Sequence, residues 1–447
     1  MKHSGQALAR ARSIVFGLLL ATLLSACTAL PGPAREEGLS TPRAVAFEGL
    51  ISSDPGRPQT RYIFQIHGIN SPGFAWGQAL LSAISASGYE LEPGQGQDWT
   101  PAQLAARKTV TGRDVVCDPP HADCRFAAFG KYRKDVFVNR DTAARVVVFS
   151  YSWRDDLWSI TGHDVQPDIQ DNTLSGLTTK RSLANALVKA KVIDEGFSEA
   201  AGYLSRVGVL EREGIETAIC AMLADAAGEQ TPPFGQDCLA RFTAADIRKL
   251  DETEFNFLSH SLGSRMIYDV LSGVTPETGQ VRRDEQLGPR TALRRRTHAL
   301  IMAANQMPLL AVSEYRVELS PQATREAETP APQRPLDFIG LNLPPGGGGA
   351  APAYSIGPTL HLTVVAFQDP DDILGFKASD AVLGAHDDSV TFVDVLHRNA
   401  RQWAFLFANP EAAHDHELEE PHSLQMILCG ADAGPDGWLK PRDCRGK

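Results

Sequence analysis

The sequence lacks an excess of positive charge. Its 447 residues include 43 Lys and Arg against 54 Asp and Glu, so the formal net charge is −11 at pH 7. Proteins that bind nucleic acid or anionic lipid headgroups through bulk charge show the opposite balance. One basic run, at residues 282–296, is most simply a solvated loop between two elements. The composition therefore argues against a nucleic-acid partner.

The N-terminal region lacks an apolar run long enough to span a membrane. The run at residues 14–24 is shorter than the about 20 residues that a spanning helix needs. It follows basic residues and precedes small ones, which is typical of a secretory signal. Leu24-Ser25-Ala26-Cys27 resembles the bacterial lipobox, in which the cysteine is acylated and begins the mature chain. The resemblance implies a signal peptide over 1–26 and a lipid anchor on Cys27, whereas an ordinary signal with an incidental cysteine is the alternative.

The residues after this cysteine extend the interpretation. Thr28 stands where an Asp would favour the inner membrane, so the same resemblance implies the outer membrane of a bacterial envelope. Residues 27–43 are rich in Pro, Gly and charge, and we expect a flexible tether there. Residues 44–447 could form one or two domains by length alone. We interpret them as a single domain with insertions at about 154–250 and 308–357.

The sequence also lacks the Cys-x-x-Cys and His-x-x-x-His spacings that are typical of zinc sites. We therefore expect no metal, and no cofactor. Six cysteines remain besides Cys27, an even number in a compartment that permits disulfides. The couples that are close in sequence are Cys117 with Cys124, Cys220 with Cys238, and Cys429 with Cys444. We predict these three disulfides, although six cysteines also allow other connectivities.

Short apolar runs, continuous rather than alternating, recur along the chain. They occupy residues 61–68, 145–153, 254–261, 297–306, 361–368 and 390–396. Continuous hydrophobicity predicts strands buried on both faces, as in a parallel sheet covered by helices. Helical patterns at 75–87 and 262–271 directly follow two of these runs. The alternation predicts an α/β fold with a doubly wound, mostly parallel sheet.

Two insertions interrupt this alternation. Residues 181–226 carry apolar positions at helical spacing, which predicts two or three helices over the edge of the sheet. Residues 320–357 contain too much Pro and Gly for regular structure and are expected to form an exposed loop. That loop could fold over a site at the end of the strands or could be a surface excursion.

One junction between a strand and a helix has the composition of a nucleophile turn. In "NFLSHSLGS", Ser261 follows an apolar strand and precedes a helical run, with small residues at Ser259 and Gly263. A sharp turn of this kind lifts a serine to a helix N-terminus, where backbone NH groups face developing negative charge. The segment resembles the G-x-S-x-G elbow of the α/β-hydrolase fold, with Ser259 in place of the first Gly. A serine that only caps the helix is the alternative.

A second segment, "YIFQIHGIN" at residues 62–70, is similar to the strand end that supplies part of the oxyanion hole in α/β hydrolases. By that match the two donors are the backbone NH groups of Ile69 and Leu262. His67 is then structural. A strand-end turn without function is the alternative.

The resemblance also implies where the acid and the base lie, because the chain order in this fold is Ser, then Asp or Glu, then His. "FQDPDDILGF" offers Asp369, Asp371 and Asp372, and it looks like the acid turn of lipase-like relatives, which favours Asp372. Sequence alone leaves the choice among the three open.

The C-terminal region offers several histidines as the base, at positions 397, 414, 416 and 422. "NPEAAH" at 409–414 resembles the histidine loop of the same lipase-like group, which points to His414. His260, beside the nucleophile, is interpreted as packing or as a pocket wall. The shorter segments "YSW" and "AANQMPLL" are also similar to that group.

Together these motifs predict a serine hydrolase of lipase or esterase type, tethered to the bacterial envelope, that acts on a small-molecule or lipid ester. The alternative is a catalytically silent α/β-hydrolase scaffold that binds an envelope partner. The length of the acyl chain and the oligomeric state do not follow from the sequence.

Overall fold

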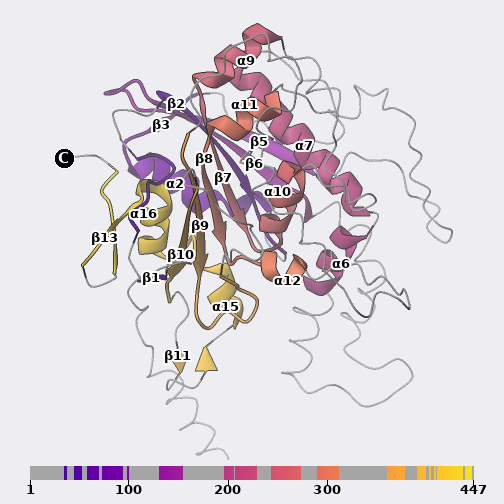
Figure 1. The fold of residues 1–447 in the computed structure, drawn as a ribbon, viewed down its shortest axis with the longest axis vertical. Coiled ribbons are helices and arrows are strands. Elements are labelled where there is room, and N and C mark those ends of the chain that lie inside the picture. The colour runs from indigo at the N-terminus through magenta and orange to yellow at the C-terminus, as the bar shows by residue number, and fades with distance from the viewer. Residues whose placement is uncertain are drawn as a thin grey trace, which may run out of the picture.

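The computed structural model of the chain places its elements around one large sheet (Figure 1). The structure describes residues 35–37, 45–52, 58–69, 73–93, 98–99, 130–154, 196–205, 207–228, 243–272, 289–311, 360–377, 390–398, 402–403, 407–408, 410–435 and 438–444. The predicted disulfide between Cys117 and Cys124, the predicted lipidation site at Cys27 and the predicted loop at 320–357 lie outside these residues.

The six apolar runs form six neighbouring parallel strands, as predicted. These are β2 (Thr60–Ile66), β6 (Arg145–Ser152), β7 (Glu254–His260), β8 (Thr297–Ala303), β9 (Leu362–Gln368) and β10 (Val390–Leu396). Their order across the sheet is β10-β9-β8-β7-β2-β6, and each adjacent pair is parallel. Nearly every residue of these strands is buried, which explains why their hydrophobicity is continuous.

Antiparallel strands complete the sheet at both edges. They are β1 (Arg35–Glu37), which pairs with β10, β5 (Lys131–Val138), which pairs with β6, and β3 (Glu90–Leu91) and β4 (Asp98–Trp99), which pair with β5. Because β1 lies within 27–43, the prediction of a flexible tether is wrong for residues 35–37. A backbone that finds ladder partners at a sheet edge can be ordered despite a polar sequence.

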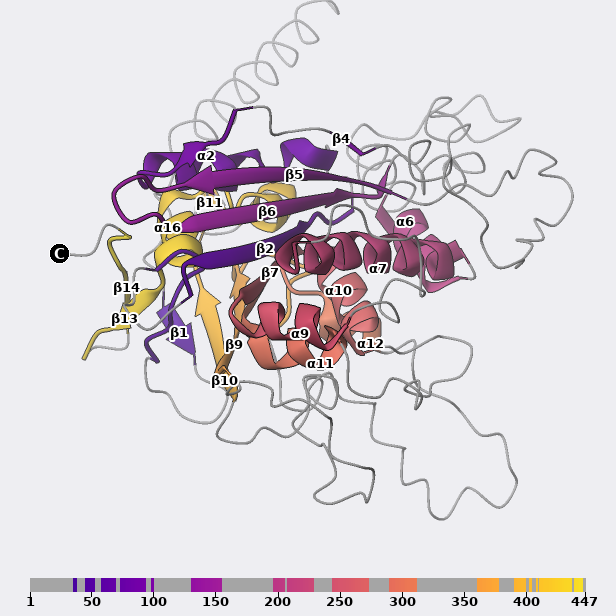
Figure 2. The same ribbon diagram turned by 90° about the horizontal axis from the view of Figure 1, so that it is seen from above.

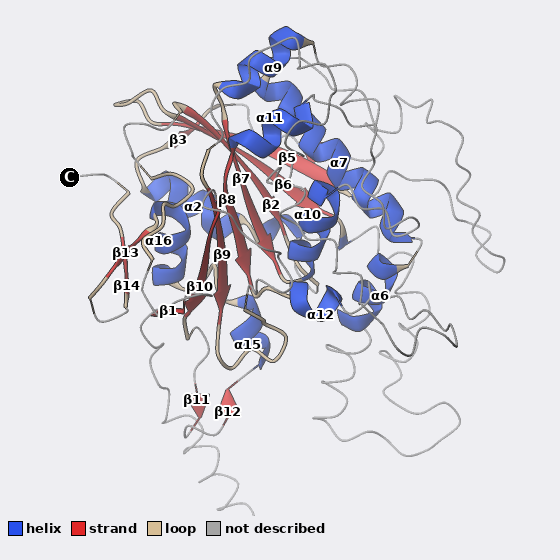
Figure 3. Cartoon of the chain, viewed as in Figure 1, coloured by secondary structure: helices blue, strands red, loops and turns tan. Residues whose placement is uncertain are grey.

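Helices cover both faces of the sheet, which gives the three layers of an α/β protein (Figures 2 and 3). One face carries α2 (Gln78–Ala86) and α16 (Pro421–Cys429), and the other carries α7 (Val207–Ala226), α10 (Leu262–Ser272) and α11 (Pro289–Arg296). Alternate residues of each strand serve the two faces: Phe64 packs with the α7 and α10 layer, and Ile63 packs with the α2 and α16 layer.

The helical insertion is placed differently from the prediction. Its described helices are α6 (Ser198–Leu204), α7 and α9 (Ala244–Asp251). Rather than covering the edge of the sheet, α7 packs on its face, against β2, β5, β6 and α10. The run from Thr217 to Ala224 is buried, so α7 needs neighbours on more than one side.

Short elements complete the chain. They are η1 (Gly73–Ala75), α12 (Met307–Ala311), β11 (Gln402–Trp403), β12 (Phe407–Ala408), α15 (Pro410–Asp415), β13 (Ala431–Ala433) and β14 (Leu439–Pro441). A disulfide joins Cys429 at the end of α16 to Cys444, with 4.8 Å between the Cα atoms, and this is the pairing expected from the sequence. Cys220 on α7 is also in a disulfide, while Cys238 lies outside the described residues. Within the part of the chain described, no helix combines the length and apolarity needed to cross a bilayer.

Candidate active site

The strand order reverses its direction at β2. The chain runs from β2 to β6 on one side of it and then crosses to β7 on the other side. Open α/β sheets bind ligands outside the carboxyl ends of their strands at such a reversal. His67 to Ile69 follow β2 there, and Ser261 follows β7. The two segments singled out in the sequence therefore meet at the switch point of the sheet.

Ser261 occupies the single-residue turn between β7 and α10. Its φ angle is 53°, in the left-handed region that residues with a side chain rarely adopt. The turn is held by two backbone hydrogen bonds: the NH of Ser261 donates to the Ala303 carbonyl at 2.9 Å, and the NH of Ser264 donates to the Ser261 carbonyl at 3.0 Å. Backbone strain of this kind costs on the order of 1–3 kcal/mol and persists where the surroundings fix it.

Small residues around the turn are required by direct contact. A Cβ atom added to Gly263 would lie 2.7 Å from the His67 carbonyl oxygen, and one added to Gly68 would lie 2.5 Å from Cβ of Ser261. Ser259, which replaces a glycine of the elbow pattern, fits because its hydroxyl donates to the Ile301 carbonyl of β8 at 3.2 Å. The hydrogen bond to β8 thus accommodates the departure from the pattern.

Three predicted residues form a hydrogen-bonded chain. The Ser261 hydroxyl donates to Nε2 of His414 at 2.8 Å. On the other side of the ring, Nδ1 of His414 lies 2.9 Å from Oδ2 of Asp372. Because a carboxylate only accepts, the proton of the neutral imidazole sits on Nδ1, which leaves the Nε2 lone pair for the hydroxyl. All three residues are buried.

The turn after β9 fixes the carboxylate of Asp372. The NH of Asp372 donates to the Asp369 carbonyl at 3.0 Å, and Oδ1 of Asp372 accepts from the NH of Leu374 at 2.8 Å. A Cβ atom on Gly375 would lie 2.4 Å from Oδ2 of Asp372, so only a glycine leaves room for the carboxylate.

The other two aspartates have separate contacts. Oδ1 of Asp369 accepts from the NH of Asp371 at 2.8 Å and so closes the turn. Asp371 forms an ion pair with Arg398 at 3.6 Å. Of the three candidates that the sequence left open, Asp372 is the one that the structure places at His414.

The remaining candidate histidines lie elsewhere. His397 faces Glu420, with 3.3 Å between Nε2 and Oε2, and its ring stacks on that of His422. His416 is 45% exposed in its side chain and lies 3.7 Å from Glu419. None of these contacts of His397 and His416 involves Ser261.

The backbone expected to form the oxyanion hole surrounds Ser261. The NH of Leu262 is the first of α10, and the first NH groups of a helix have no acceptor within the helix. On the other side, Gly68 touches Ser261, and Ile69 follows it. Nδ1 of His67 donates to the Gly68 carbonyl at 2.8 Å, and Nε2 accepts from the NH of Trp153 at 3.3 Å. His67 therefore has the structural role that the sequence suggested.

The hydrogen bonds of Asn305 beside the acid turn were not predicted from the sequence, although the segment "AANQMPLL" was noted. Asn305, which is fully buried, accepts from the Phe376 NH at 2.7 Å and donates from Nδ2 to the Phe376 carbonyl at 3.1 Å. Its Oδ1 accepts from the NH of Met307 at the start of α12. The neighbouring Gln306 places Nε2 3.5 Å from Nε2 of His414.

Two buried groups lie beside His414: His260, which the sequence analysis interpreted as packing or as a pocket wall, and Glu417, to which it gave no role. His260 is 1% exposed and places Nε2 2.8 Å from the backbone carbonyl of His414. Glu417 lies behind it, and its pKa is raised well above the ordinary value by burial and then by the nearby Asp372. No sequence pattern reveals either interaction. His260 contacts a main-chain carbonyl, and the raised pKa of Glu417 results from burial.

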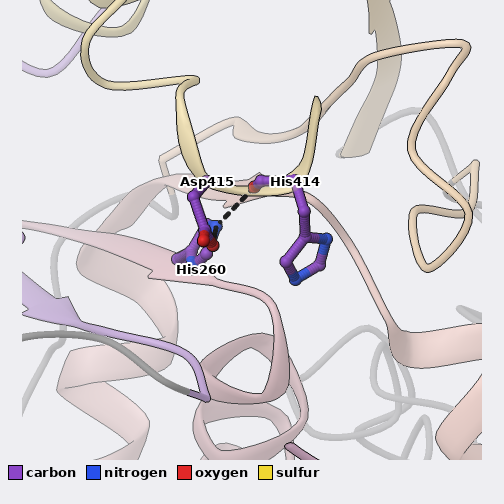
Figure 4. Close-up of side chains that lie close together, drawn as sticks. All are labelled: His260, His414 and Asp415. Carbon is purple, nitrogen blue, oxygen red and sulfur yellow. Dashed lines mark hydrogen bonds and ion pairs between the residues drawn. The ribbon is translucent and has the colours of Figure 1, made fainter. Parts of the chain in front are cut away.

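One group of side chains near the site has metal-ligand chemistry. Ligand atoms of His260, His414 and Asp415 lie within 4.8 Å of one another. Figure 4 shows the imidazole of His414 turned away from the other two side chains, and both of its ring nitrogens already have partners in Asp372 and Ser261. A cation bound there would have to break those bonds, so the arrangement favours proton transfer over metal binding.

Comparisons with protein-family models, with curated proteins and with solved structures found no match for this chain.

Proposed function

We propose that this chain is a serine hydrolase with the α/β-hydrolase fold that cleaves carboxylic esters through an acyl-enzyme. The observation that carries the proposal is the chain of hydrogen bonds from Ser261 through His414 to Asp372, built on a strained turn at the switch point of the sheet. The order of these residues in the sequence is the order found in α/β hydrolases.

The acylation step follows from this geometry. Oγ of Ser261 attacks the ester carbonyl carbon while its proton passes to Nε2 of His414. Asp372 holds the resulting imidazolium and its orientation. The backbone NH groups of Leu262 and Ile69 face the oxyanion. As the intermediate collapses, the carbon–oxygen bond to the leaving alcohol breaks and His414 returns the proton to that oxygen.

Deacylation repeats the sequence with water. His414 takes a proton from the attacking water, whose oxygen bonds to the acyl carbon. The bond to Oγ of Ser261 then breaks, and the proton returns to the serine. The carboxylic acid leaves, and the site is restored without a cofactor.

Location is a second part of the proposal. The lipobox-like segment ending at Cys27 supports a lipid anchor in the bacterial envelope, with the outer membrane favoured by Thr28. The ester substrate would then be met at or near a membrane surface.

A panel of p-nitrophenyl esters with acyl chains of increasing length tests the proposed activity. The wild-type protein should release nitrophenol, and Ser261→Ala should not. Ser82→Ala, which removes an exposed hydroxyl on α2, is the matched control and should behave as wild type. Folded wild-type protein that hydrolyses no ester of the panel would favour the silent scaffold.

A further inference from the structure

His260 lies between the proposed nucleophile and the loop that carries the proposed base. It is the last residue of β7, directly before Ser261, and it is buried. Its ring lies 5.2 Å from the ring of His414 and 5.5 Å from that of Trp76, centroid to centroid. Figure 4 shows the two rings on the same side of the ribbon through His414, with the hydrogen bond running from His260 to the His414 backbone.

The contact between His260 and His414 has a defined direction. Nε2 of His260 is 2.8 Å from the His414 carbonyl oxygen, and because a carbonyl only accepts, Nε2 carries the proton. The carbonyl belongs to the last turn of α15, where carbonyl groups receive no hydrogen bond from within the helix. The imidazole therefore satisfies the end of α15 and ties it to β7.

Other acceptors near Nε2 are too distant to compete. Oδ1 of Asp415 and Oε2 of Glu417 each lie 3.9 Å from Nε2 of His260, beyond hydrogen-bond distance. Within the described chain the two carboxyl oxygens of Glu417 have no hydrogen-bond partner, although the residue is buried. Among the described residues, the one hydrogen bond of the His260 side chain thus goes to the backbone of His414.

The charge states of His260 and Glu417 favour the hydrogen bond from His260 to the His414 carbonyl. Burial, reinforced by the neighbouring His414, lowers the pKa of His260 to about 3. His260 is therefore neutral at physiological pH and keeps one proton for Nε2. Burial also raises the pKa of Glu417, which disfavours an anion that would draw this proton away.

We propose that His260 is a positioning residue for the base, and that its hydrogen bond to the His414 carbonyl keeps the His414 imidazole in reach of Ser261. The helix α15 has six residues, too few to be stable alone, so its end depends on such contacts. A displacement of about 1 Å at a catalytic group can cost on the order of 100-fold in rate. The inference relies on the proposed function only in naming His414 the base.

Two substitutions separate the hydrogen bond from the packing of the ring. In His260→Gln the amide nitrogen reaches the position of Nε2, whereas in His260→Asn it reaches only the position of Nδ1, which faces Gly68. His416→Asn is the matched control, because it makes the same change at an exposed histidine two residues from His414. All variants are compared as the full chain in detergent, with melting temperature as the measure of folding.

Two readouts are recorded. The first is the low-field proton resonance of Nδ1 of His414 in protein labelled with ¹⁵N-histidine, which reports the bond to Asp372 without any need for turnover. The second is the rate at which a fluorophosphonate probe labels Ser261. We expect His260→Gln to stay close to wild type in both, and His260→Asn to lose the resonance and about 100-fold of the labelling rate.

The outcomes distinguish this inference from the proposed function. If wild-type protein shows the resonance but no labelling, and only His260→Asn loses the resonance, the positioning role stands and the hydrolase proposal fails. If His260→Asn keeps both signals, or if folded His260→Gln loses them as fully as His260→Asn, the positioning role is wrong. Absence of the resonance from folded wild-type protein also overturns it.

Discussion

The backbone of Gly68 and the side chain of Ser261 are in direct contact, since a Cβ atom on Gly68 would lie 2.5 Å from Cβ of Ser261. A glycine therefore brings the end of β2 against the turn after β7. This contact, between residues almost two hundred positions apart in the chain, places the peptide of Ile69 next to the proposed nucleophile.

The substitution Gly68→Ala should reduce esterase activity by about 100-fold or more, because the added methyl group displaces either Ser261 or the peptide that holds the oxyanion. Crowding of this kind costs about 1–3 kcal/mol of stability, so the variant should still fold. Steady-state kinetics and a urea titration measure the two effects. Full activity in Gly68→Ala would show that the contact is not part of the site.

Asp372→Asn should lower kcat by about 10⁴-fold, because an amide in place of the carboxylate favours the wrong tautomer of His414. Asp371→Asn is the matched control: its carboxylate faces Arg398, and its loss should change kcat little. Steady-state turnover of a p-nitrophenyl ester compares the two variants. Equal loss in both would mean that Asp372 is not the acid.

Glu417→Gln should become more stable relative to wild type as pH rises. Because burial raises the pKa of Glu417 in the folded state, the folded chain holds this proton more tightly than the unfolded chain. The wild-type protein therefore loses stability as pH rises above the ordinary value of 4.5 toward the raised pKa, and glutamine removes that loss.

Free energies of unfolding from urea titrations at pH 4 and pH 8 provide the measurement. The difference between Glu417→Gln and wild type should be small at pH 4 and should favour the variant at pH 8. Glu419→Gln, at an exposed position, should show no such dependence. The same pH dependence in Glu417→Gln and wild type would contradict a protonated, buried Glu417.

Cys27→Ser should move the protein from the membrane fraction to the soluble fraction, because the acyl chains that the lipobox resemblance implies can no longer be attached. Ser261→Ala, which leaves the N-terminal segment intact, should remain with the membrane. Fractionation followed by immunoblotting reports the result. A Cys27→Ser variant that stays in the membrane fraction would rule out the lipid anchor.

Much of the sheet could be predicted because its central strands are buried on both faces. Six continuous apolar runs became six adjacent parallel strands. The strand β5 was missed, since its sequence KYRKDVFV mixes charged and apolar residues at an edge that needs burial only in part. The placement of α7 was also wrong, because helical spacing reveals an apolar surface but not which part of the sheet it covers.

The candidate site likewise contains residues that the sequence identified and residues that it did not. Ser261, Asp372 and His414 stand in segments whose local sequence is unusual, and the structure brings their side chains together. Asn305 and His260 act through backbone groups of Phe376 and His414. A backbone acceptor is present at every residue, so no sequence pattern marks these contacts, and only the folded chain reveals them.

The most direct test of the proposed nucleophile is mass spectrometry of the protein after reaction with a fluorophosphonate. We predict one phosphonyl group per chain, located on the peptide that contains Ser261, and no labelling of either Ser261→Ala or His414→Ala within the same time. Labelling at another serine, or equal labelling of Ser261→Ala, would contradict the account.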